Sequence, residues 1–219
     1  MNLLDIIGPV MVGPSSSHTA GAVKIGQVAR KLIAEKVMRA DIFLHGSFLA
    51  TGKGHGTDKA LVAGLLGMAV DDPHIPYSFE IAKKEGLEFH ISGIDLGDVH
   101  PNSVKLNLTG ISGKKIEVIA ASVGGGQIEI CEIDGLSASV GGDYPTLIVN
   151  HLDVPGRVTA VTSMLSKKGV NIAGMKLYRT VRGGEAVMVV ECDQEVPMEA
   201  VAWLEGLEGI LKVTYLSLK

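Results

Sequence analysis

The sequence has little of what a disulfide scaffold, a metal knuckle, a nucleic-acid surface or a membrane span requires. It contains two cysteines, Cys131 and Cys192, too few and too far apart for a disulfide framework or closely spaced metal ligands. The net charge is −4, and lysines and arginines are scattered rather than clustered, so we expect no nucleic-acid partner. The longest apolar run, at 60–70, is far shorter than the roughly 20 residues that cross a bilayer. We therefore expect no membrane segment.

A targeting segment and several common catalytic motifs are also missing. Residues 1–12 are apolar but lack a basic leader and include Asp5, so they do not resemble a signal peptide, and we expect a cytoplasmic protein. The segment at 13–17 does not complete the G-x-S-x-G motif of serine hydrolases, and 52–57 does not complete G-x-G-x-x-G. With no P-loop and no H-E-x-x-H, nucleotide-binding and zinc-protease interpretations have no support.

Glycine, by contrast, is abundant: 28 of the 219 residues are glycines, and they lie between apolar runs. This distribution indicates tight turns and backbone that closely approaches a ligand, rather than a flexible polymer. The hydrophobic content of 46% and the charged content of 20% are ordinary for a globular protein, and the length allows one or two domains.

The most informative stretch lies at 13–19, Gly-Pro-Ser-Ser-Ser-His-Thr, and leads into an amphipathic helix predicted over 19–34. A single hydroxyl is enough to cap a helix, because its oxygen accepts a hydrogen bond from a free N–H of the first turn. This stretch offers four hydroxyls and His18. The surplus favours a site for an anion such as a carboxylate at the positive end of the helix, and an over-decorated N-cap is the alternative.

A second histidine-bearing segment follows at 51–59, where His55 lies between Gly54 and Gly56. We expect this glycine-rich segment to be a loop that enters a helix at 60–68, with Thr57 or Asp58 as its cap. A single histidine is more often structural than catalytic. Two such polar loops so close in the sequence favour a functional site.

A run of strands is predicted after these helices, at 87–94, 104–108, 115–123 and 127–133, beside an earlier buried strand at 41–45 and a short helix at 78–84. Asn102 precedes one strand, in the segment His-Pro-Asn-Ser at 100–103. Ser122 and three glycines, Gly124, Gly125 and Gly126, join two strands. These glycines fit either a bulged hairpin or a backbone nest for an anion.

The last third of the chain has a compact and regular pattern. After a candidate linker at 141–145, the order is strand 146–152, helix 157–168, strand 171–179, strand 185–192, helix 198–207 and strand 210–218. This βαββαβ order predicts a ferredoxin-like domain. We therefore expect an α/β (α+β) protein of two domains, at 1–143 and 146–219.

The second domain resembles an ACT domain, a module that senses small molecules and usually pairs with a second copy. The residues that carry the resemblance are Asp-Val-Pro-Gly-Arg-Val at 153–158 and Gly-Val-Asn-Ile at 169–172. In serine-sensing ACT domains a His and an Asn two residues apart precede the Pro-Gly; His151 matches the first, and Asp153 replaces the second. The resemblance implies an amino-acid effector, self-association through this domain, and effector contacts from His151, Asp153, Gly156 and Asn171.

The chain as a whole resembles the β subunit of iron–sulfur-dependent L-serine dehydratase (L-serine ammonia-lyase). The motifs are GPSSSHT at 13–19, GHGTDKA at 54–60, HPNS at 100–103 and SVGGG at 122–126. The first domain is also similar to the allosteric substrate-binding domain of some phosphoglycerate dehydrogenases. The resemblance implies the conversion of L-serine to pyruvate and ammonia, a step of amino-acid catabolism and gluconeogenesis. It also implies a separate α subunit that holds a [4Fe–4S] cluster, and activity only with that subunit.

The cysteine content agrees with a cluster held by another chain, because two cysteines in different domains cannot supply the three or four thiolates that a cluster needs. The family reaction requires a general base, and histidine, with a pKa near ~6.5, suits that role. We expect His55 as the base, with His18 as its partner or proton shuttle, and no metal ligand in this chain. The expected substrate-binding residues are Ser15, Ser16, Ser17, Thr19, Thr57, Asn102, Ser122, Gly124, Gly125 and Gly126.

Two other functions remain open. The chain could be an amino-acid-sensing regulatory subunit without catalytic groups, which explains the anion-binding loops but leaves both histidines incidental. It could also be a pyridoxal-phosphate dehydratase with Lys53 or Lys59 as the Schiff-base lysine, although neither lies in a familiar pocket pattern. Of the other histidines, we expect His100 to order the turn before Asn102. We expect His45 to be a core residue or, because Gly46 follows it, part of the site.

Overall fold

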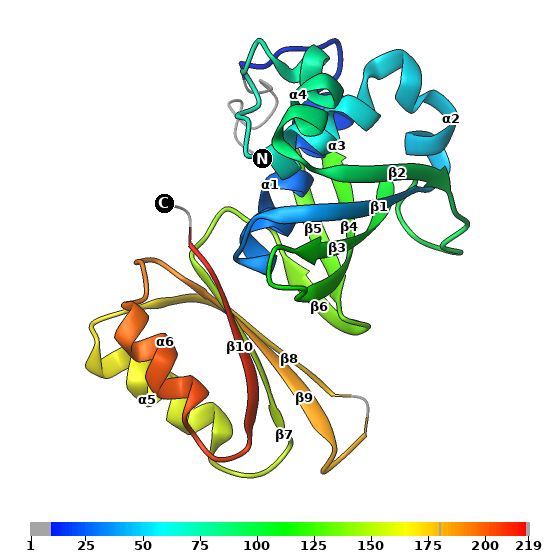
Figure 1. The fold of residues 1–219 in the computed structure, drawn as a ribbon. Helices are drawn as coiled ribbons and strands as arrows, with labels where there is room; N and C mark the ends of the chain where they lie inside the picture. Colours follow the sequence, from blue (N-terminus) through cyan, green and yellow to red (C-terminus); the bar gives the residue numbers. More distant parts are fainter. Residues whose placement is uncertain (1–9, 180, 218–219) are drawn as a thin grey trace. The chain divides into compact units, whose positions relative to one another are not determined.

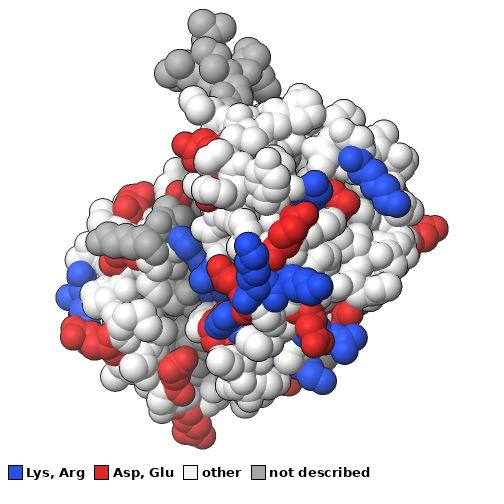
Figure 2. Space-filling model, turned by 45° about the horizontal axis from the view of Figure 1, so that its top comes forward, with Lys and Arg blue, Asp and Glu red and all other residues white. Residues whose placement is uncertain are grey.

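The computed structural model describes residues 10–179 and 181–217 and divides into two compact units, Met1–Gly135 and Leu136–Lys219 (Figure 1). Residues 1–9, where the sequence predicts no signal peptide, lie outside the described residues. Among the helices of the described part, none is long and apolar enough to cross a membrane. On the face drawn in Figure 2, lysines and arginines lie beside aspartates and glutamates and do not gather into one basic patch.

The first sheet has six strands in the order β2-β1-β3-β4-β5-β6. The β1–β2 pair is parallel, and β1, β3, β4 and β5 pair antiparallel in turn. The strands are β1 (Val37–Leu44), β2 (Glu88–Gly93), β3 (Ser103–Gly110), β4 (Lys115–Gly124), β5 (Gln127–Ile133) and β6 (Leu136–Val140). The first five were predicted with ends that differ by a few residues, whereas β6 was not. Alternate residues of β1 and β3, such as Ile42 and Leu106, are fully buried, as the period-2 pattern of a half-covered sheet requires.

Helices connect and cover strands β1 to β5 in the first unit. They are the π-helical turn η2 (Ser16–Gly21), α1 (Ala22–Ile33), α2 (Gly46–His55), α3 (Thr57–Leu66), the 3-10 turn η3 (Ile75–Tyr77) and α4 (Ser78–Glu85). Because α2, α3 and α4 lie between β1 and β2, they form the crossover that makes this pair parallel.

Helices α1 and α3 cross in close contact through two glycines. A Cβ on Gly64 would lie 2.1 Å from the carbonyl oxygen of Val23, and one on Gly26 would lie 2.5 Å from that of Leu61. Both distances are shorter than any real Cβ contact, so only glycine allows this separation of the helix axes. This crossing places the first turns of η2 and α3 in the same part of the unit.

The first predicted helix is confirmed, with one local difference. Ser15 is the N-cap, as expected of a hydroxyl before a helix, and its Oγ accepts a hydrogen bond from the His18 N–H at 3.1 Å. The first six residues after it form a π-helical turn, and regular α-helix follows up to Ile33. Ala34 then ends α1 in the left-handed conformation, with φ +60°.

The predicted loop at 51–59 is wrong. Most of it belongs to α2, which ends at His55, and α3 begins directly at Thr57. Gly56, with φ +68°, is the left-handed residue between the two helices, and its N–H donates to the Gly52 carbonyl. Neither Thr57 nor Asp58 caps α3 with its side chain, since Gly56 occupies the N-cap position. His55 therefore lies at a helix–helix corner.

The second unit contains a sheet of order β10-β7-β9-β8, all antiparallel, with two helices on one face (Figure 1). Its elements are β7 (Thr146–Leu152), α5 (Arg157–Lys167), β8 (Ile172–Arg179), β9 (Glu185–Cys192), α6 (Met198–Glu205) and β10 (Ile210–Leu216). Leu147, Leu165 and Leu204 are fully buried in its core. The predicted βαββαβ order is confirmed; the predicted end of the last strand, Leu218, lies outside the described residues.

Candidate functional site

His18 and His55, the two predicted catalytic residues, are neighbours in the first unit. Their ring centroids are 4.9 Å apart, and the planes are inclined by 43°. The Phe48 ring contacts His18 edge-on, with centroids 5.3 Å apart, and is itself completely buried. The π-helical turn brings His18 to this place, and the end of α2 brings His55. The structure thus joins two motifs that are distant in the sequence.

The environment of His18 lowers its pKa below the ordinary value. Desolvation by partial burial is the main cause, and the nearby charge of His55 adds to it, while a hydrogen bond with the Ser47 backbone acts in the opposite direction. A lower pKa keeps the imidazole neutral over more of the physiological pH range. A neutral imidazole has one nitrogen that can accept a proton, so His18 is suited to proton transfer.

His55 and Thr19 line a cavity of about 330 Å³. Thr19 is buried, and its Oγ1 donates a hydrogen bond to the His55 carbonyl at 3.1 Å. This hydrogen bond links η2 to the end of α2. Lys53 and Lys59 add two ammonium groups to the wall, and the Asp58 carboxylate accepts from the Lys59 N–H at 2.8 Å. The remaining lining residues are Val12, Gly13, Pro14, Gly54, Gly56, Ile75 and Pro76. This polar wall suits a small molecule with a carboxylate.

Three buried polar atoms near these segments have no hydrogen-bond partner within the described part of the chain. They are His55 Nδ1, Thr57 Oγ1 and Ser122 Oγ. Thr57 and Ser122 are fully buried. Leaving a buried polar atom unpaired costs free energy, so such atoms are candidates for contact with a ligand or water. His55, Thr57 and Ser122 were all predicted as site residues.

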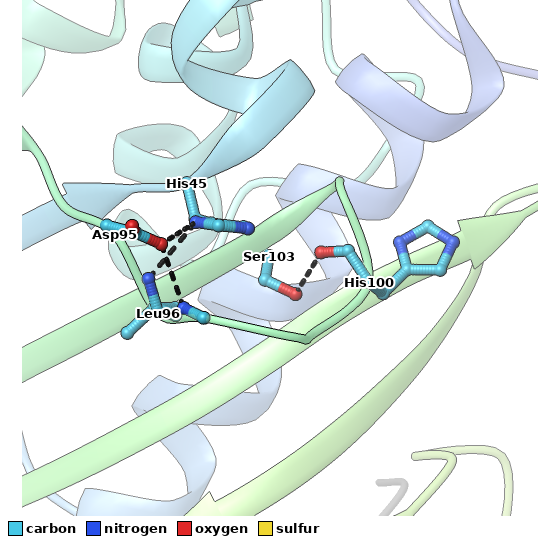
Figure 3. A network of polar contacts seen from close by, with 6 residues as sticks. His45, Asp95, Leu96, His100 and Ser103 are labelled. Atoms are coloured by element: carbon cyan, nitrogen blue, oxygen red, sulfur yellow. Dashed lines mark hydrogen bonds and ion pairs between the residues drawn. The ribbon is translucent and has the colours of Figure 1, made fainter.

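Asn102 and Ser122 are held together by their backbones. The Ser122 N–H donates to the Asn102 carbonyl at 3.0 Å, and the Asn102 side-chain amide lies 3.4 Å from the Ser122 carbonyl. The Asn102 N–H donates to His100 Nδ1 at 3.1 Å, which confirms that His100 orders this turn. Ser103 Oγ donates to the His100 carbonyl at 2.6 Å (Figure 3). The Asn102 amide thus joins the ends of β3 and β4.

The three glycines at 124–126 form a bulged hairpin rather than part of the cavity wall. Gly125 and Gly126, with φ +59° and +78°, are the two loop residues between β4 and β5, as a type I′ turn requires. Gly124, with φ +109°, pairs with Gln127, and the register shifts between Ser122 and Gly124. The hairpin accounts for all three glycines, and none of them lines the cavity beside His55. Their predicted contact with the substrate has no support in this geometry.

Ser15, Ser16 and Ser17 contribute unequally to the site. Ser15 Oγ accepts from the His18 N–H and lies 3.5 Å from His18 Nδ1, so this hydroxyl is next to the imidazole. Ser16 and Ser17 begin the π-helical turn and are half-buried, and neither lines the cavity.

The contacts of His18 with α2 include residues that the sequence analysis missed. His18 Nε2 lies 3.2 Å from Ser47 Oγ and 3.1 Å from Thr51 Oγ1, and Phe48 contacts the same ring. The one available signal was the i, i+4 spacing of Ser47 and Thr51, which places both hydroxyls on one face of a helix. The glycines at 52 and 54 concealed that helix.

His45, predicted as a core residue, is half-buried and hydrogen-bonded at the beginning of α2. Its Nδ1 accepts from the Leu96 N–H at 3.2 Å and lies 3.9 Å from Asp95 Oδ1, as Figure 3 shows. Nδ1 cannot accept from Leu96 and donate to Asp95 in the same state. Since the shorter contact is with Leu96, we assign His45 as an acceptor that fixes the loop after β2.

The predicted effector residues of the second unit do not form one site within a single copy of that unit. His151 is buried, its Nδ1 donates to the Leu152 carbonyl at 2.8 Å, and its Nε2 has no partner among the described residues. The Asn171 side-chain amide donates a hydrogen bond to Asp193 Oδ2 at 2.6 Å. Asn171 lies immediately before β8, whose first residue, Ile172, pairs with Cys192. His151 pairs with Ala186, at the other end of β9. Asn171 and His151 therefore lie at opposite ends of the sheet.

Asp153 and Gly156 serve the local fold around β7. Asp153 Oδ2 accepts from the Gly183 N–H and from Arg179 Nη1, both at 3.0 Å. These two hydrogen bonds hold the pKa of Asp153 below its ordinary value, and the one from Gly183 has the larger effect. Gly156, with φ +91°, is the N-cap of α5. The carboxylate that replaces the expected Asn thus holds the β8–β9 connection.

Comparison with known proteins agrees with both units. A model of the serine dehydratase beta chain family matches residues 3–87, and one of the ACT domain matches residues 146–208. The probable L-serine dehydratase beta chain of Bacillus subtilis is 39% identical over 213 residues, 97% of this chain and 96% of that protein. The chain belongs to the L-serine dehydratase beta-chain family. The beta chain of the Peptoniphilus asaccharolyticus enzyme is 38% identical over 212 residues, 96% of each chain.

The chain is also similar to part of a longer protein. L-serine dehydratase 1 of Escherichia coli is 26% identical over 206 residues, which cover 81% of this beta chain and 42% of that protein. More than half of that enzyme therefore lies outside the match.

The residues of this beta chain do not fit an iron–sulfur cluster. Cys192 is buried and Cys131 half-buried, each in a different unit, and burial raises the pKa of both thiols to about 11. A cluster needs three or four thiolates, and two cysteines in different units cannot supply them. Across 10–179 and 181–217, no three His, Cys, Asp or Glu side chains come together as a metal-binding group.

Proposed function

We propose that this beta chain, together with a cluster-bearing α subunit, converts L-serine to pyruvate and ammonia. The observation that carries the proposal is the His18–His55 pair beside a cavity with two lysines. The family membership supports a serine dehydratase system, and the extra length of the Escherichia coli relative supports a second component. We place the [4Fe–4S] cluster on that component, because this chain has only two cysteines and they lie in different units.

In the proposed reaction this chain binds the substrate and moves protons. His55 takes the α-proton of serine, and hydroxide leaves the β-carbon as the C=C bond of aminoacrylate forms. Aminoacrylate then takes a proton on carbon to become the imine, which water hydrolyses to pyruvate and ammonia. His18, neutral and 4.9 Å from His55 between ring centroids, is the partner that can share the proton. Lys53 and Lys59 of the wall would hold the serine carboxylate.

The experiment is anaerobic turnover of L-serine to pyruvate by this chain alone, by a reconstituted α subunit alone, and by the mixture. Turnover that requires both chains supports the proposal. Equal turnover by the α subunit alone would mean that this chain is a regulatory subunit. Turnover by this chain alone would contradict the assignment of the cofactor to the partner; a yellow colour of the purified chain would then indicate pyridoxal phosphate.

We further propose that the second unit binds an amino-acid effector and associates with a second copy of itself. His151 and Asn171 lie at opposite ends of one sheet, so one small ligand that contacts both requires residues from two copies. The buried and unpartnered Nε2 of His151 supports a role for this residue as a donor or acceptor to a ligand. Equilibrium sedimentation with and without L-serine tests the association.

A further inference from the structure

The side of α2 that faces His18 contributes two hydroxyls one helical turn apart. Ser47 Oγ and Thr51 Oγ1 lie 3.2 Å and 3.1 Å from His18 Nε2, and 3.5 Å from each other. Phe48 contacts the same imidazole edge-on. The ring is therefore fixed in place by three side chains of α2, outside the motifs predicted to bind substrate.

The donors and acceptors around Nε2 decide where the proton of the neutral imidazole resides. Thr51 Oγ1 donates its one proton to the Ser47 carbonyl at 2.9 Å. A hydroxyl that has given its proton to a carbonyl can only accept from a second partner. A hydrogen bond between His18 Nε2 and Thr51 Oγ1 then needs the hydrogen on Nε2, whereas a Ser47 hydroxyl that donates to Nε2 would need a lone pair there. The shorter contact, with Thr51, favours the hydrogen on Nε2. Nδ1 is left with the lone pair, 3.5 Å from Ser15 Oγ.

We propose that Thr51 is a positioning residue that holds His18 in the Nε2–H tautomer, through the relay His18 Nε2–H to Thr51 Oγ1–H to the Ser47 carbonyl. The basic atom of His18 is then Nδ1, directed to the side of Ser15. The consequence for turnover rests on the proposed function, because it requires His18 to exchange a proton during the reaction. The assignment of the tautomer itself does not depend on that reaction.

The test is nitrogen NMR of the full chain labelled with ¹⁵N-histidine, in which the ring nitrogens of His18 report which one carries hydrogen. The variants are Thr51→Val, which keeps the shape of the exposed side chain but removes the acceptor, and Thr51→Ser, which restores it. Ser47→Ala is the matched control, because it removes a hydroxyl near Nε2 but keeps the backbone carbonyl of the relay. We expect the Nε2–H tautomer in the wild type, Thr51→Ser and Ser47→Ala, and its loss in Thr51→Val.

An Nδ1–H tautomer in the wild type overturns the proposal, as does a Thr51→Val variant whose His18 signals are unchanged. Loss of the tautomer in Ser47→Ala but not in Thr51→Val would also overturn it, since the Ser47 hydroxyl would then be the determinant. In the reconstituted enzyme we expect Thr51→Val to lower kcat by about tenfold or more at a similar KM, with recovery in Thr51→Ser. If Thr51→Val changes the tautomer but leaves kcat intact, the relay is supported and the role of His18 in the proposed function is contradicted.

Discussion

The imidazoles of His18 and His55 lie 4.9 Å apart between ring centroids, although one belongs to the first turn after the N-cap Ser15 and the other to the last residue of α2. This juxtaposition is the structural basis of the proposed proton transfer. When one ring is protonated, its charge disfavours a second proton on the other. The charge of His55 accordingly contributes to the lowered pKa of His18.

His55→Gln should abolish most of the turnover of the reconstituted enzyme, with kcat reduced by about 10²-fold or more, because glutamine cannot act as a base. The measurement is pyruvate formation under anaerobic conditions with a saturating amount of the α subunit. His74→Gln is the matched control, since His74 is exposed, is hydrogen-bonded to Asp72 and does not itself line the cavity. Near-normal turnover of His55→Gln would contradict its role as base.

The pH dependence of stability should reflect the lowered pKa of His18. Its pKa in the folded chain lies below that in the unfolded chain, so between the two values the unfolded chain binds more protons. The contribution of His18 to the free energy of unfolding is therefore present above the unfolded pKa and is lost as the pH falls through the folded pKa. The free energy of unfolding in urea, measured at about pH 7.5 and about pH 5.5, should decrease toward the lower pH by more in the wild type than in His18→Gln. An equal decrease in the two proteins would contradict this assignment.

Two glycine substitutions should have opposite effects on stability. Gly64→Ala places a Cβ 2.1 Å from the Val23 carbonyl oxygen and forces α1 and α3 apart, at a cost of about 1–3 kcal/mol or more. Gly54→Ala meets no atom within 4 Å in the last turn of α2 and should stabilise by about 0.5–1 kcal/mol. The free energies of unfolding in urea test both. A Gly64→Ala variant as stable as Gly54→Ala would show that the helices can separate without cost.

Asp153→Ala should loosen the connection between β8 and β9. The variant removes the acceptor of the Gly183 N–H, so the exchange of this amide with solvent should become faster. Amide hydrogen exchange followed by NMR measures the effect. Asp193→Ala is the control, because Asp193 accepts from Asn171 at the other end of the sheet and should leave Gly183 unchanged. Unaltered exchange in Asp153→Ala would indicate that Arg179 and the strands alone order this turn.

Much of the fold was predictable, because local patterns in the sequence agree with the final structure. The sequence of the second unit contains alternating apolar residues, turn residues and two helical segments at short intervals. Its strands then pair in the order expected for a βαββαβ domain. The Ser15 cap and α1 likewise follow from local rules. The motifs at 13–19 and 54–60 were also sufficient to select His18 and His55.

The sequence by itself therefore predicted most of the elements and singled out the two histidines, while the tertiary structure decided which side chains lie around these histidines. Gly52 and Gly54 lower the local helix propensity by about 1 kcal/mol each, yet α2 forms because packing of residues such as the fully buried Phe48 compensates. Only this helix brings Ser47 and Thr51 to His18. The glycines at 124–126 are explained by the pairing of β4 with β5, and Asn171 lies away from His151 because of strand register. Contacts between segments that are distant in the sequence decide these three features, so they could not be predicted from local sequence patterns.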